Sequence, residues 1–300
     1  MPDPTPVLIL GAAGQLGHEL MAHLRADLPV VAGTRHTSPA FDLAAPNSLH
    51  DAIHSVAPKL IINCAAYTAV DKAESEPELA ETVNAISPGV IAEYCAQARI
   101  PLIHYSTDYV FDGSAHHPYT EEDRTAPLGV YGRTKLLGEQ AIAASGCQHY
   151  IFRTSWVYAA HGQNFLNTML RLATERDALS IVEDQKGSPT WTGFLVRETT
   201  RLLKQLQEPS HNPPASGVYH LTCSGETTWY DFAANIFEIA LQRGIIERAP
   251  KLTAITSDQY PTPANRPHYS VLDNSKVRQQ LQLQSMHWKE ALENCLRHKA

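Results

Sequence analysis

The stretch VLILGAAGQLGHEL, residues 7–20, decides the fold class of this 300-residue chain. Four apolar residues typical of a buried strand run into a glycine-rich turn, and leucines then recur at the spacing of one helix face. In such a turn one glycine allows the sharp bend, another lets backbone N–H groups approach a pyrophosphate, and a third lets helix and strand pack closely. The spacing is GxxGxxG, and its strand–turn–helix context predicts a nucleotide-cofactor site at Gly11, Gly14 and Gly17.

The alternation of apolar strands and helices continues through the first half. Strands are predicted at 7–10, 29–33, 60–65, 101–106 and 150–154. Helices are predicted between them, one opening at 46–48 with Asn47 as its cap and others over 77–98 and 131–144. Fully apolar strands that alternate with helices predict a parallel sheet covered on both faces.

The second half is less regular and richer in proline and glycine. Helices are predicted at 164–175, 192–206 and 228–241, strands at 179–184 and 218–222, and a loop at 207–217. We therefore predict an α/β fold: a Rossmann-type, doubly wound parallel sheet with a smaller C-terminal substrate lobe. The predicted division is a Rossmann domain at 1–157 with a return segment at 186–222, and a lobe formed by 158–185 and 223–300.

Composition excludes several classes of protein. The net charge of −7 argues against a nucleic-acid partner, and no apolar run is long enough for a membrane span. Five scattered cysteines without a CxxC pair and an N-terminus without a basic region favour a reduced, cytoplasmic protein. The helical pair His50 and His54 lacks the glutamate of a HExxH zinc motif, so a solvated helix face is the favoured interpretation.

The second strand ends in VVAGTRHTS, residues 30–38, without the acidic residue that usually holds the ribose 2′-hydroxyl of NAD. It offers Arg35 instead, and a guanidinium can accommodate a 2′-phosphate. NADPH is therefore favoured over NADH, which stays open as a second cofactor. The alternative for Arg35 is a surface residue in a loop.

The segment YGRTK, residues 131–135, holds the only one of the 12 tyrosines that has a lysine four residues later. Spacing alone puts any such pair on one helix face. Thr107, however, stands at the end of the strand 101–106, where ligands of open α/β sheets bind. Tyr131 would donate a proton to a substrate carbonyl, and Thr107 would hold that carbonyl. Lys135, together with the positive charge of the cofactor, would lower the pKa of the tyrosine.

These motifs resemble the extended short-chain dehydrogenase/reductase superfamily. The segments NCAAYTAVDKAESEPELAETVNA, HYSTDYVFDG, YGRTKLLGE, RTSWVY, DQKGSPTW and RPHYSVLDNSKV resemble, more narrowly, its dTDP-4-dehydrorhamnose reductase family over nearly the whole chain. The resemblance implies NADPH-dependent reduction of the 4-keto group of dTDP-4-dehydro-6-deoxy-L-mannose to dTDP-L-rhamnose. That reaction is the last step of dTDP-rhamnose biosynthesis, which supplies cell-surface polysaccharide.

The resemblance also implies roles for single residues. It makes Thr107, Tyr131 and Lys135 the catalytic triad. It places Gln15 and Leu16 along the pyrophosphate, Asp42 and Leu43 by the adenine, Ala65, Ala66 and Tyr67 along the dinucleotide, and Asn84 in support of the site. It turns Thr68, Val70, Asp71, Thr107, Tyr109 and Trp156 toward the sugar nucleotide.

Two of the substrate assignments have alternatives in the sequence. The indole of Trp156, just past a strand end, would form a stacking wall for a sugar or base, or it would be ordinary core. Arg266 in PANRPHYS would clasp the substrate diphosphate, or it would make an ion pair between the domains.

Some features depart from related enzymes. Members that bind magnesium at a dimer interface use two acids, and this chain has Glu19 but no acid after Thr190 in SPTWTGFL. We therefore expect no magnesium and a monomer or weak homodimer. Dehydratases of the superfamily have Asp-Glu after the strand-end threonine, where this chain has Asp108 and Tyr109. The alternatives that stay open are a non-catalytic NADP-binding regulatory subunit and another sugar-nucleotide reductase or epimerase.

Overall fold

The structure is a computed structural model that describes residues 5–208, 214–297 and 299. At its centre lies a six-stranded sheet in the order β10-β5-β4-β3-β1-β2, with every neighbouring pair parallel. The strands are β1 (Val7–Leu10), β2 (Val30–Gly33), β3 (Leu60–Asn63), β4 (Leu102–Thr107), β5 (His149–Thr154) and β10 (Gly217–His220). The predicted parallel sheet is confirmed. Because β2 and β3 flank β1 on opposite sides, the chain changes winding direction at β1, which is where such sheets open a crevice.

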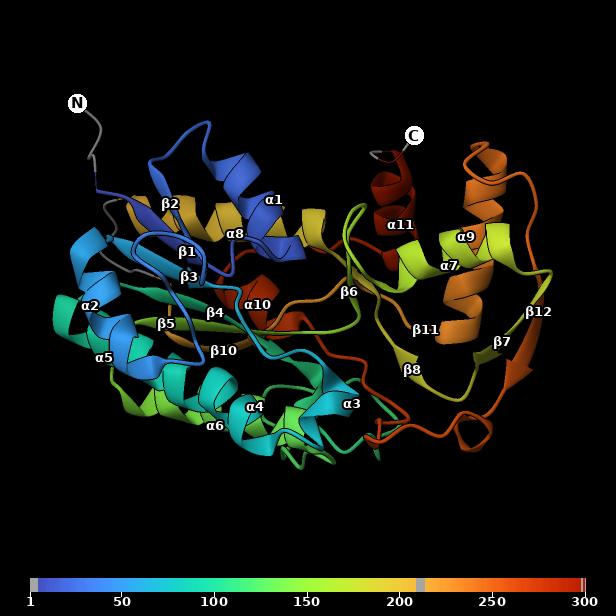
Figure 1. The fold of residues 1–300 in the computed structure, drawn as a ribbon, viewed down its shortest axis with the longest axis horizontal. Coiled ribbons are helices and arrows are strands. Elements are labelled where there is room, and N and C mark those ends of the chain that lie inside the picture. The colour runs from blue at the N-terminus through green and yellow to red at the C-terminus, as the bar shows by residue number, and fades with distance from the viewer. Residues whose placement is uncertain (1–4, 209–213, 298, 300) are drawn as a thin grey trace.

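Helices cover both faces of this sheet (Figure 1). One face carries α1 (Gln15–Leu24) and α8 (Thr192–Gln207); the other carries α2 (Pro46–Val56), α5 (Ser87–Ala98) and α6 (Val130–Ala144). The side chains of β1 alternate between the two cores: Val7 and Ile9 join the first, and Leu8 and Leu10 join the second. This alternation explains why the strand is apolar throughout.

Short helical segments connect β3 to β4 and β4 to α6. They are α3 (Val70–Ala73), α4 (Pro77–Glu81), a π-helix (Thr82–Ile86) and a 3₁₀ turn (Asp108–Val110). The prediction that Asn47 caps α2 is wrong, because that helix begins at Pro46 and its cap position is Ala45, with no side-chain cap. Proline fits the first helical position, where no backbone N–H is needed.

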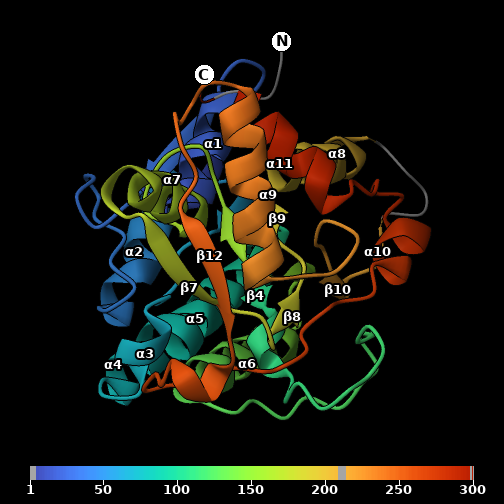
Figure 2. The same ribbon diagram turned by 90° about the vertical axis from the view of Figure 1, so that its right-hand side faces the viewer.

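A second group of elements lies beyond one end of the sheet, on the right of Figure 1 and toward the viewer in Figure 2. It contains α7 (Phe165–Glu175), β7 (Ala178–Val182), α9 (Trp229–Gln242), β12 (Lys251–Ile255), a 3₁₀ turn (Ser257–Gln259) and α11 (Trp288–Arg297). β7 and β12 form a parallel pair, and α10 (Ser275–Gln280) lies near β10. We call this group the lobe.

Two short strand pairs join the lobe to the sheet: β6 (Val157–Tyr158) with β9 (Thr190–Trp191), and β8 (Lys186–Gly187) with β11 (Thr227–Thr228). One apolar core runs from Ile9 in the sheet through Tyr158 to Phe232 in the lobe. A continuous core of this kind favours a fixed placement of the lobe. Predicted loop 207–217 lies partly outside the described residues, at 209–213.

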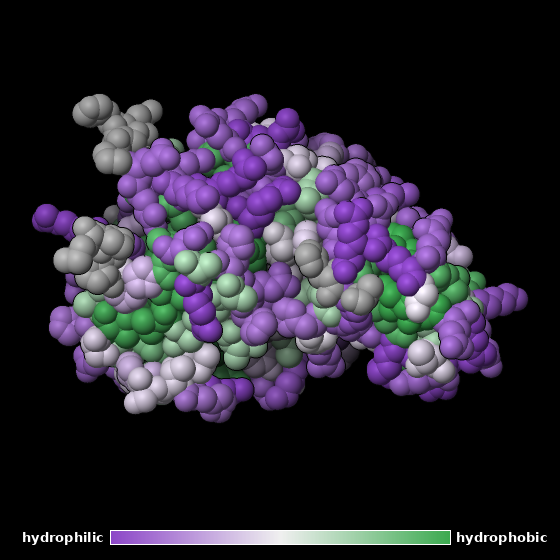
Figure 3. Space-filling view, turned by 90° about the horizontal axis from the view of Figure 1, so that it is seen from above, coloured by the Kyte–Doolittle hydropathy of each residue, from purple (hydrophilic) through white to green (hydrophobic). Residues whose placement is uncertain are grey.

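The surface above α1 and α8 is mostly hydrophilic, with separate hydrophobic areas toward its two ends (Figure 3). Among the described residues, no helix combines the length and the apolar character that crossing a membrane requires.

Candidate active site

The glycine turn after β1 has the close packing that its sequence predicts. Gly11 has a φ of 76°, and a Cβ there would lie 2.7 Å from the backbone nitrogen of Ala65. A Cβ on Gly17 would lie 2.3 Å from the carbonyl oxygen of Gly11. No acidic residue stands in the first turn of α1. A helix N-terminus approached by a side-chain-free backbone, without a competing carboxylate, fits the diphosphate of a dinucleotide.

Residues beside the turn come from both parts of the molecule. Leu16 is buried under the turn, and Gln15 accepts a hydrogen bond of 2.6 Å from the side chain of Asn164. Asn164 also caps α7, where its side chain accepts from the backbone of Asn167. The cap was visible in the sequence as an asparagine before an amphipathic run. Its contact with Gln15, 149 positions away, was not.

The predicted adenine side lies at the opposite edge of the sheet from β5. Arg35 follows β2 and is exposed, in a turn closed by the side chain of Thr37. Asp42 accepts a hydrogen bond from the backbone of Ala44, and the carbonyl of Leu43 accepts one of 2.6 Å from Ser87. These contacts hold the loop that follows Arg35 against α5.

The loop after β3 is clamped by Asn84. The amide oxygen of Asn84 accepts from the backbone of Tyr67 at 2.8 Å, and its nitrogen donates to the carbonyl of the same residue at 3.1 Å. Asn84 sits in the π-helix, a geometry often found at functional sites. A Cβ on Gly138 would lie 2.1 Å from the Asn84 carbonyl, so this glycine lets α6 pack against the clamp. Ala65 and Ala66 complete the loop.

The three predicted catalytic residues lie at the carboxyl end of β4 and on α6. Thr107 is the last residue of β4, and Tyr131 stands in the first turn of α6. Burial raises the pKa of Tyr131 to about 12, although the Thr107 side chain opposes the rise. Lys135 is not among the groups that shift this pKa, so the lowering expected from the lysine together with the cofactor's charge stays a prediction. The lysine Nζ donates instead to the carbonyl of Tyr105 at 2.6 Å and lies 3.1 Å from Nε2 of His104.

Beneath the triad lies a buried carboxyl, Asp108. The hydroxyl of Thr107 donates to its Oδ1 at 3.1 Å. Burial raises the pKa of Asp108 to about 6, and the side chains of Ser270 and Thr107 oppose the rise.

Arg266 brings the lobe's last long segment onto the Rossmann side of the site. Its Nη2 lies 2.8 Å from Oδ2 of Asp71, and its charge opposes the rise that burial causes in the pKa of Tyr109. The ring of Tyr109 meets that of Tyr131 edge-on, with centroids 5.5 Å apart. Burial alone would raise the pKa of Asp71, but hydrogen bonds from Arg266 and the backbone of Ala264 lower it. The ion pair considered from the sequence is present, and it joins three of the predicted substrate residues. Val70 begins α3 just before Asp71, and Thr68 stands in the loop that enters this helix.

Trp156 lies against a second tryptophan that the sequence did not single out. Its indole stacks on that of Trp229, with centroids 3.5 Å apart and planes 4° from parallel. A Cβ on Gly187 would lie 2.5 Å from the Trp156 ring, so only glycine fits beside it. Trp156 itself is partly exposed and has a φ of 46°. One face of the Trp156 indole is thus covered by Trp229, which the prediction of a stacking wall for a sugar or base did not include.

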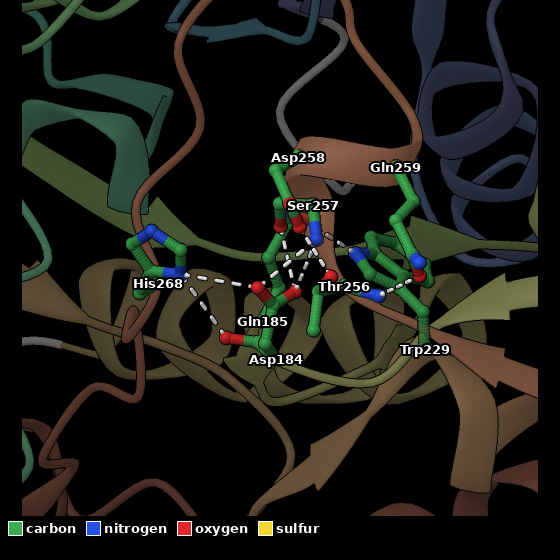
Figure 4. Close-up of polar contacts among 8 residues, drawn as sticks. All are labelled: Asp184, Gln185, Trp229, Thr256, Ser257, Asp258, Gln259 and His268. Atoms are coloured by element: carbon green, nitrogen blue, oxygen red, sulfur yellow. Dashed lines mark hydrogen bonds and ion pairs between the residues drawn. The ribbon is translucent and has the colours of Figure 1, made fainter.

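The position of Trp229 is fixed by a polar network in the lobe (Figure 4). Its Nε1 donates to Gln185 at 3.2 Å, and Gln185 donates in turn to the hydroxyl of Ser257 at 2.9 Å. Ser257 also donates to Asp184, whose carbonyl lies 3.2 Å from Nδ1 of His268. No local sequence pattern connects these positions, which belong to four separate segments.

No cluster of three His, Cys, Asp or Glu side chains that could hold a metal ion is found within the described ranges. Glu19, the acid noted in the sequence, lies 3.6 Å from Nδ1 of His161.

The RmlD substrate binding domain model matches residues 5–300. A dTDP-4-dehydrorhamnose reductase of Escherichia coli K12 is 44% identical over 291 residues, which are 97% of this chain and 96% of that protein.

Two solved structures are also similar. A dTDP-4-dehydrorhamnose reductase of Clostridium acetobutylicum has a TM-score of 0.88 at 36% identity, covering 98% of this chain and 99% of that one. The enzyme of the same name from Bacillus anthracis, solved in complex with NADP, has a TM-score of 0.89 at 32% identity, covering 99% and 100%.

Proposed function

The chain belongs to the RmlD substrate binding domain family of dTDP-4-dehydrorhamnose reductases, and we propose that Thr107, Tyr131 and Lys135 carry out its reaction. The reaction is the NADPH-dependent reduction of the 4-keto group of dTDP-4-dehydro-6-deoxy-L-mannose to dTDP-L-rhamnose, the last step of dTDP-rhamnose biosynthesis. The observation that carries the assignment is that Thr107 ends β4 and Tyr131 begins α6 at the carboxyl edge of the sheet, where the glycine turn follows β1.

The glycine turn is the proposed pyrophosphate site, with Gln15 and Leu16 beside it. Asn84 holds the loop of Ala65, Ala66 and Tyr67 along the dinucleotide. The exposed Arg35, after β2, is the proposed partner of a 2′-phosphate, and Asp42 and Leu43 are the proposed residues beside the adenine. When bound, NADPH supplies the hydride.

Tyr131 is the proposed proton donor. Its raised pKa keeps the hydroxyl protonated at neutral pH, as a donor to a carbonyl oxygen that gains negative charge requires. Thr107 orients the same oxygen through its hydroxyl. Lys135, one helical turn on, contributes positive charge that favours the phenolate once the proton has left.

The lobe, with residues 158–185 and 223–300, is the proposed sugar-nucleotide side, and residues 1–157 with 186–222 are the proposed Rossmann domain. Thr68, Val70, Asp71, Tyr109 and Trp156 face the substrate in this proposal. Arg266 has the fork geometry that suits a diphosphate. Its bond to Asp71 fixes that fork before substrate arrives. We also propose a cytoplasmic enzyme that works as a monomer or weak homodimer, which sedimentation at working concentrations tests.

Turnover with a panel of nucleotide 4-keto sugars tests the function. The expected result is one NADPH consumed for each dTDP-4-keto-6-deoxy-L-mannose reduced, with smaller rates for other bases and stereoisomers. A non-catalytic regulatory subunit would bind NADPH and leave it unoxidised. Incubation with dTDP-glucose and catalytic NADP⁺ should yield no 4-keto sugar, because Tyr109 replaces the glutamate that dehydratases use as a base. Formation of that product would overturn the assignment.

A further inference from the structure

A chain of four hydrogen bonds runs under the site, from the dinucleotide loop to Lys135. The backbone N–H of Ala65 donates to Oδ1 of Asn63 at 3.0 Å, and Nδ2 of Asn63 lies 3.1 Å from Nδ1 of His104. On the other side of the ring, Nε2 of His104 lies 3.1 Å from Nζ of Lys135. Lys135 finally donates to the carbonyl of Tyr105 at 2.6 Å. The side chains of Asn63, His104 and Lys135 are all buried.

The groups at the two ends of this series of hydrogen bonds fix the donor and the acceptor in each bond. A backbone N–H can only donate, so the Asn63 oxygen must face Ala65 and its nitrogen must face His104. The Nδ1 of His104 then accepts, which leaves the proton of a neutral ring on Nε2. That proton points at Nζ of Lys135. An amine can accept it and still donate to the carbonyl, whereas an ammonium has no lone pair to offer.

We propose that His104 is a positioning residue for the proposed reductase reaction, holding the Nε2–H tautomer and so reducing the proton affinity of Lys135. Charging the lysine removes the His104–Lys135 hydrogen bond and frees the ammonium to turn toward the site. Rotating the side-chain amide of Asn63 by half a turn would let His104 accept a hydrogen bond from the ammonium. It would also leave the N–H of Ala65 unpaired, and an unmade buried hydrogen bond is costly. The inference rests on the proposed function for its kinetic consequence, but not for the tautomer.

The electrostatic surroundings agree with this role. Burial lowers the pKa of Lys135 to about 8, although Glu139 on the same helix opposes the shift. Glu139 is paired with Arg153 of β5 at 2.7 Å, which offsets its charge. Burial, and then the charge of Lys135, lowers the pKa of His104 well below its usual value. On α6, Glu139 lies one turn after Lys135, and the titratable side chain of Tyr131 lies one turn before it. The imidazole therefore stays neutral at working pH, and its tautomer decides what it offers to the lysine.

The first test is the ¹⁵N chemical shift pattern of the histidine rings in cofactor-free protein. His104 is identified by the signals lost in His104→Gln. His220, which is also buried among the described residues, is identified by those lost in His220→Gln. We expect His104 to be Nε2–H from about pH 7 to about pH 9 without becoming an imidazolium. An Nδ1–H ring overturns the proposal, whatever the protein's turnover.

The second test is the pH profile of kcat/KM. The activity should fall as pH rises through the pKa of Lys135, because the ammonium is the form that favours the phenolate. Glutamine at 104 can turn its amide oxygen to an ammonium, so His104→Gln should move this alkaline limb upward by roughly one pH unit. His220→Gln removes an equally buried imidazole, bonded to the carbonyl of Tyr119, and should leave the limb in place. A lower kcat in His104→Gln with an unmoved limb would mean a packing role only.

Should His104→Gln fail to fold, Asn63→Leu removes the donor that faces Nδ1 and predicts the same upward shift. Absence of any NADPH oxidation by the unaltered chain would refute the proposed function, while the tautomer measurement would still decide the inference.

Discussion

Arg266 and Asp71, 195 positions apart in the chain, form an ion pair in which Nη2 lies 2.8 Å from Oδ2. The pair lies near the proposed catalytic residues, because the charge of Arg266 acts on Tyr109, whose ring meets that of Tyr131 edge-on. A pair that is only partly exposed holds both side chains in place more firmly than a fully solvated one.

Replacing Arg266 with alanine should raise KM for the sugar nucleotide by roughly 10-fold or more and leave NADPH affinity unchanged, because the diphosphate loses its bidentate donor. Asp71→Ala should raise the same KM by less, since it loosens the guanidinium without removing it. Steady-state kinetics of both variants and of the double variant measures the coupling. Equal KM values for Arg266→Ala and the unaltered chain would leave the residue as a link between domains.

Tyr131→Phe should lower kcat by roughly 100-fold or more while NADPH binds as before, because only the proton donor is removed. Tyr94→Phe, on α5 away from the site, is the matched loss of a hydroxyl and should keep full activity. Cofactor fluorescence titration and turnover give the two readouts. Comparable turnover in both variants would contradict the role of Tyr131 as the proton donor of the triad.

Arg35→Ala should weaken NADPH binding by about 10-fold or more and change NADH binding little, because only NADPH carries the 2′-phosphate. Isothermal titration with each cofactor measures the ratio. Parallel losses for the two would identify Arg35 as an ordinary surface residue, in agreement with its exposure.

Gly17→Ala should weaken NADPH binding and lower stability by about 1–3 kcal/mol, because its Cβ would lie 2.3 Å from the Gly11 carbonyl oxygen and displace the turn. Gly89→Ala on α5 is the control. Its Cβ meets only the Cβ of Ala141, at 3.4 Å, so the variant should be neutral or slightly stabilising. Chemical denaturation of both variants, with cofactor binding, checks the contrast.

Asp108→Asn should stabilise the protein at pH 7 to 8 and have no such effect near pH 4. The folded pKa of about 6 lies above the usual 3.8, so the folded chain binds more protons between these values and loses stability as pH rises through them. The gain is at most on the order of 2–3 kcal/mol.

Asp112→Asn is the control of opposite sign. Hydrogen bonds from Ser114 lower the pKa of Asp112, so its contribution is present at neutral pH and lost as pH falls through the folded pKa. Melting temperatures of both variants across pH separate the two cases. A gain from Asp108→Asn that is as large at pH 4 as at pH 7 would contradict the buried-carboxylate account.

Much of the fold was predictable because it rests on local patterns. The apolar run of β1, the glycines after it and the tyrosine–lysine spacing on α6 each lie within a few residues, where side-chain period and backbone sterics act directly. The predicted cap of α2 was wrong although the pattern is local, because the helix begins at Pro46 and Asn47 therefore lies inside it.

The sequence by itself determined the order of strands and helices, the turn that fits a diphosphate, and which residue types carry the chemistry. Tertiary structure alone decided where Lys135 donates its hydrogen bonds, which indole stacks on Trp156, and that Arg266 reaches Asp71. The physical reason is that these contacts join elements far apart in the chain, and burial and hydrogen-bond direction depend on how the elements pack. For His104 of β4, only the packing of the sheet against α6 decided its partners, Asn63 and Lys135.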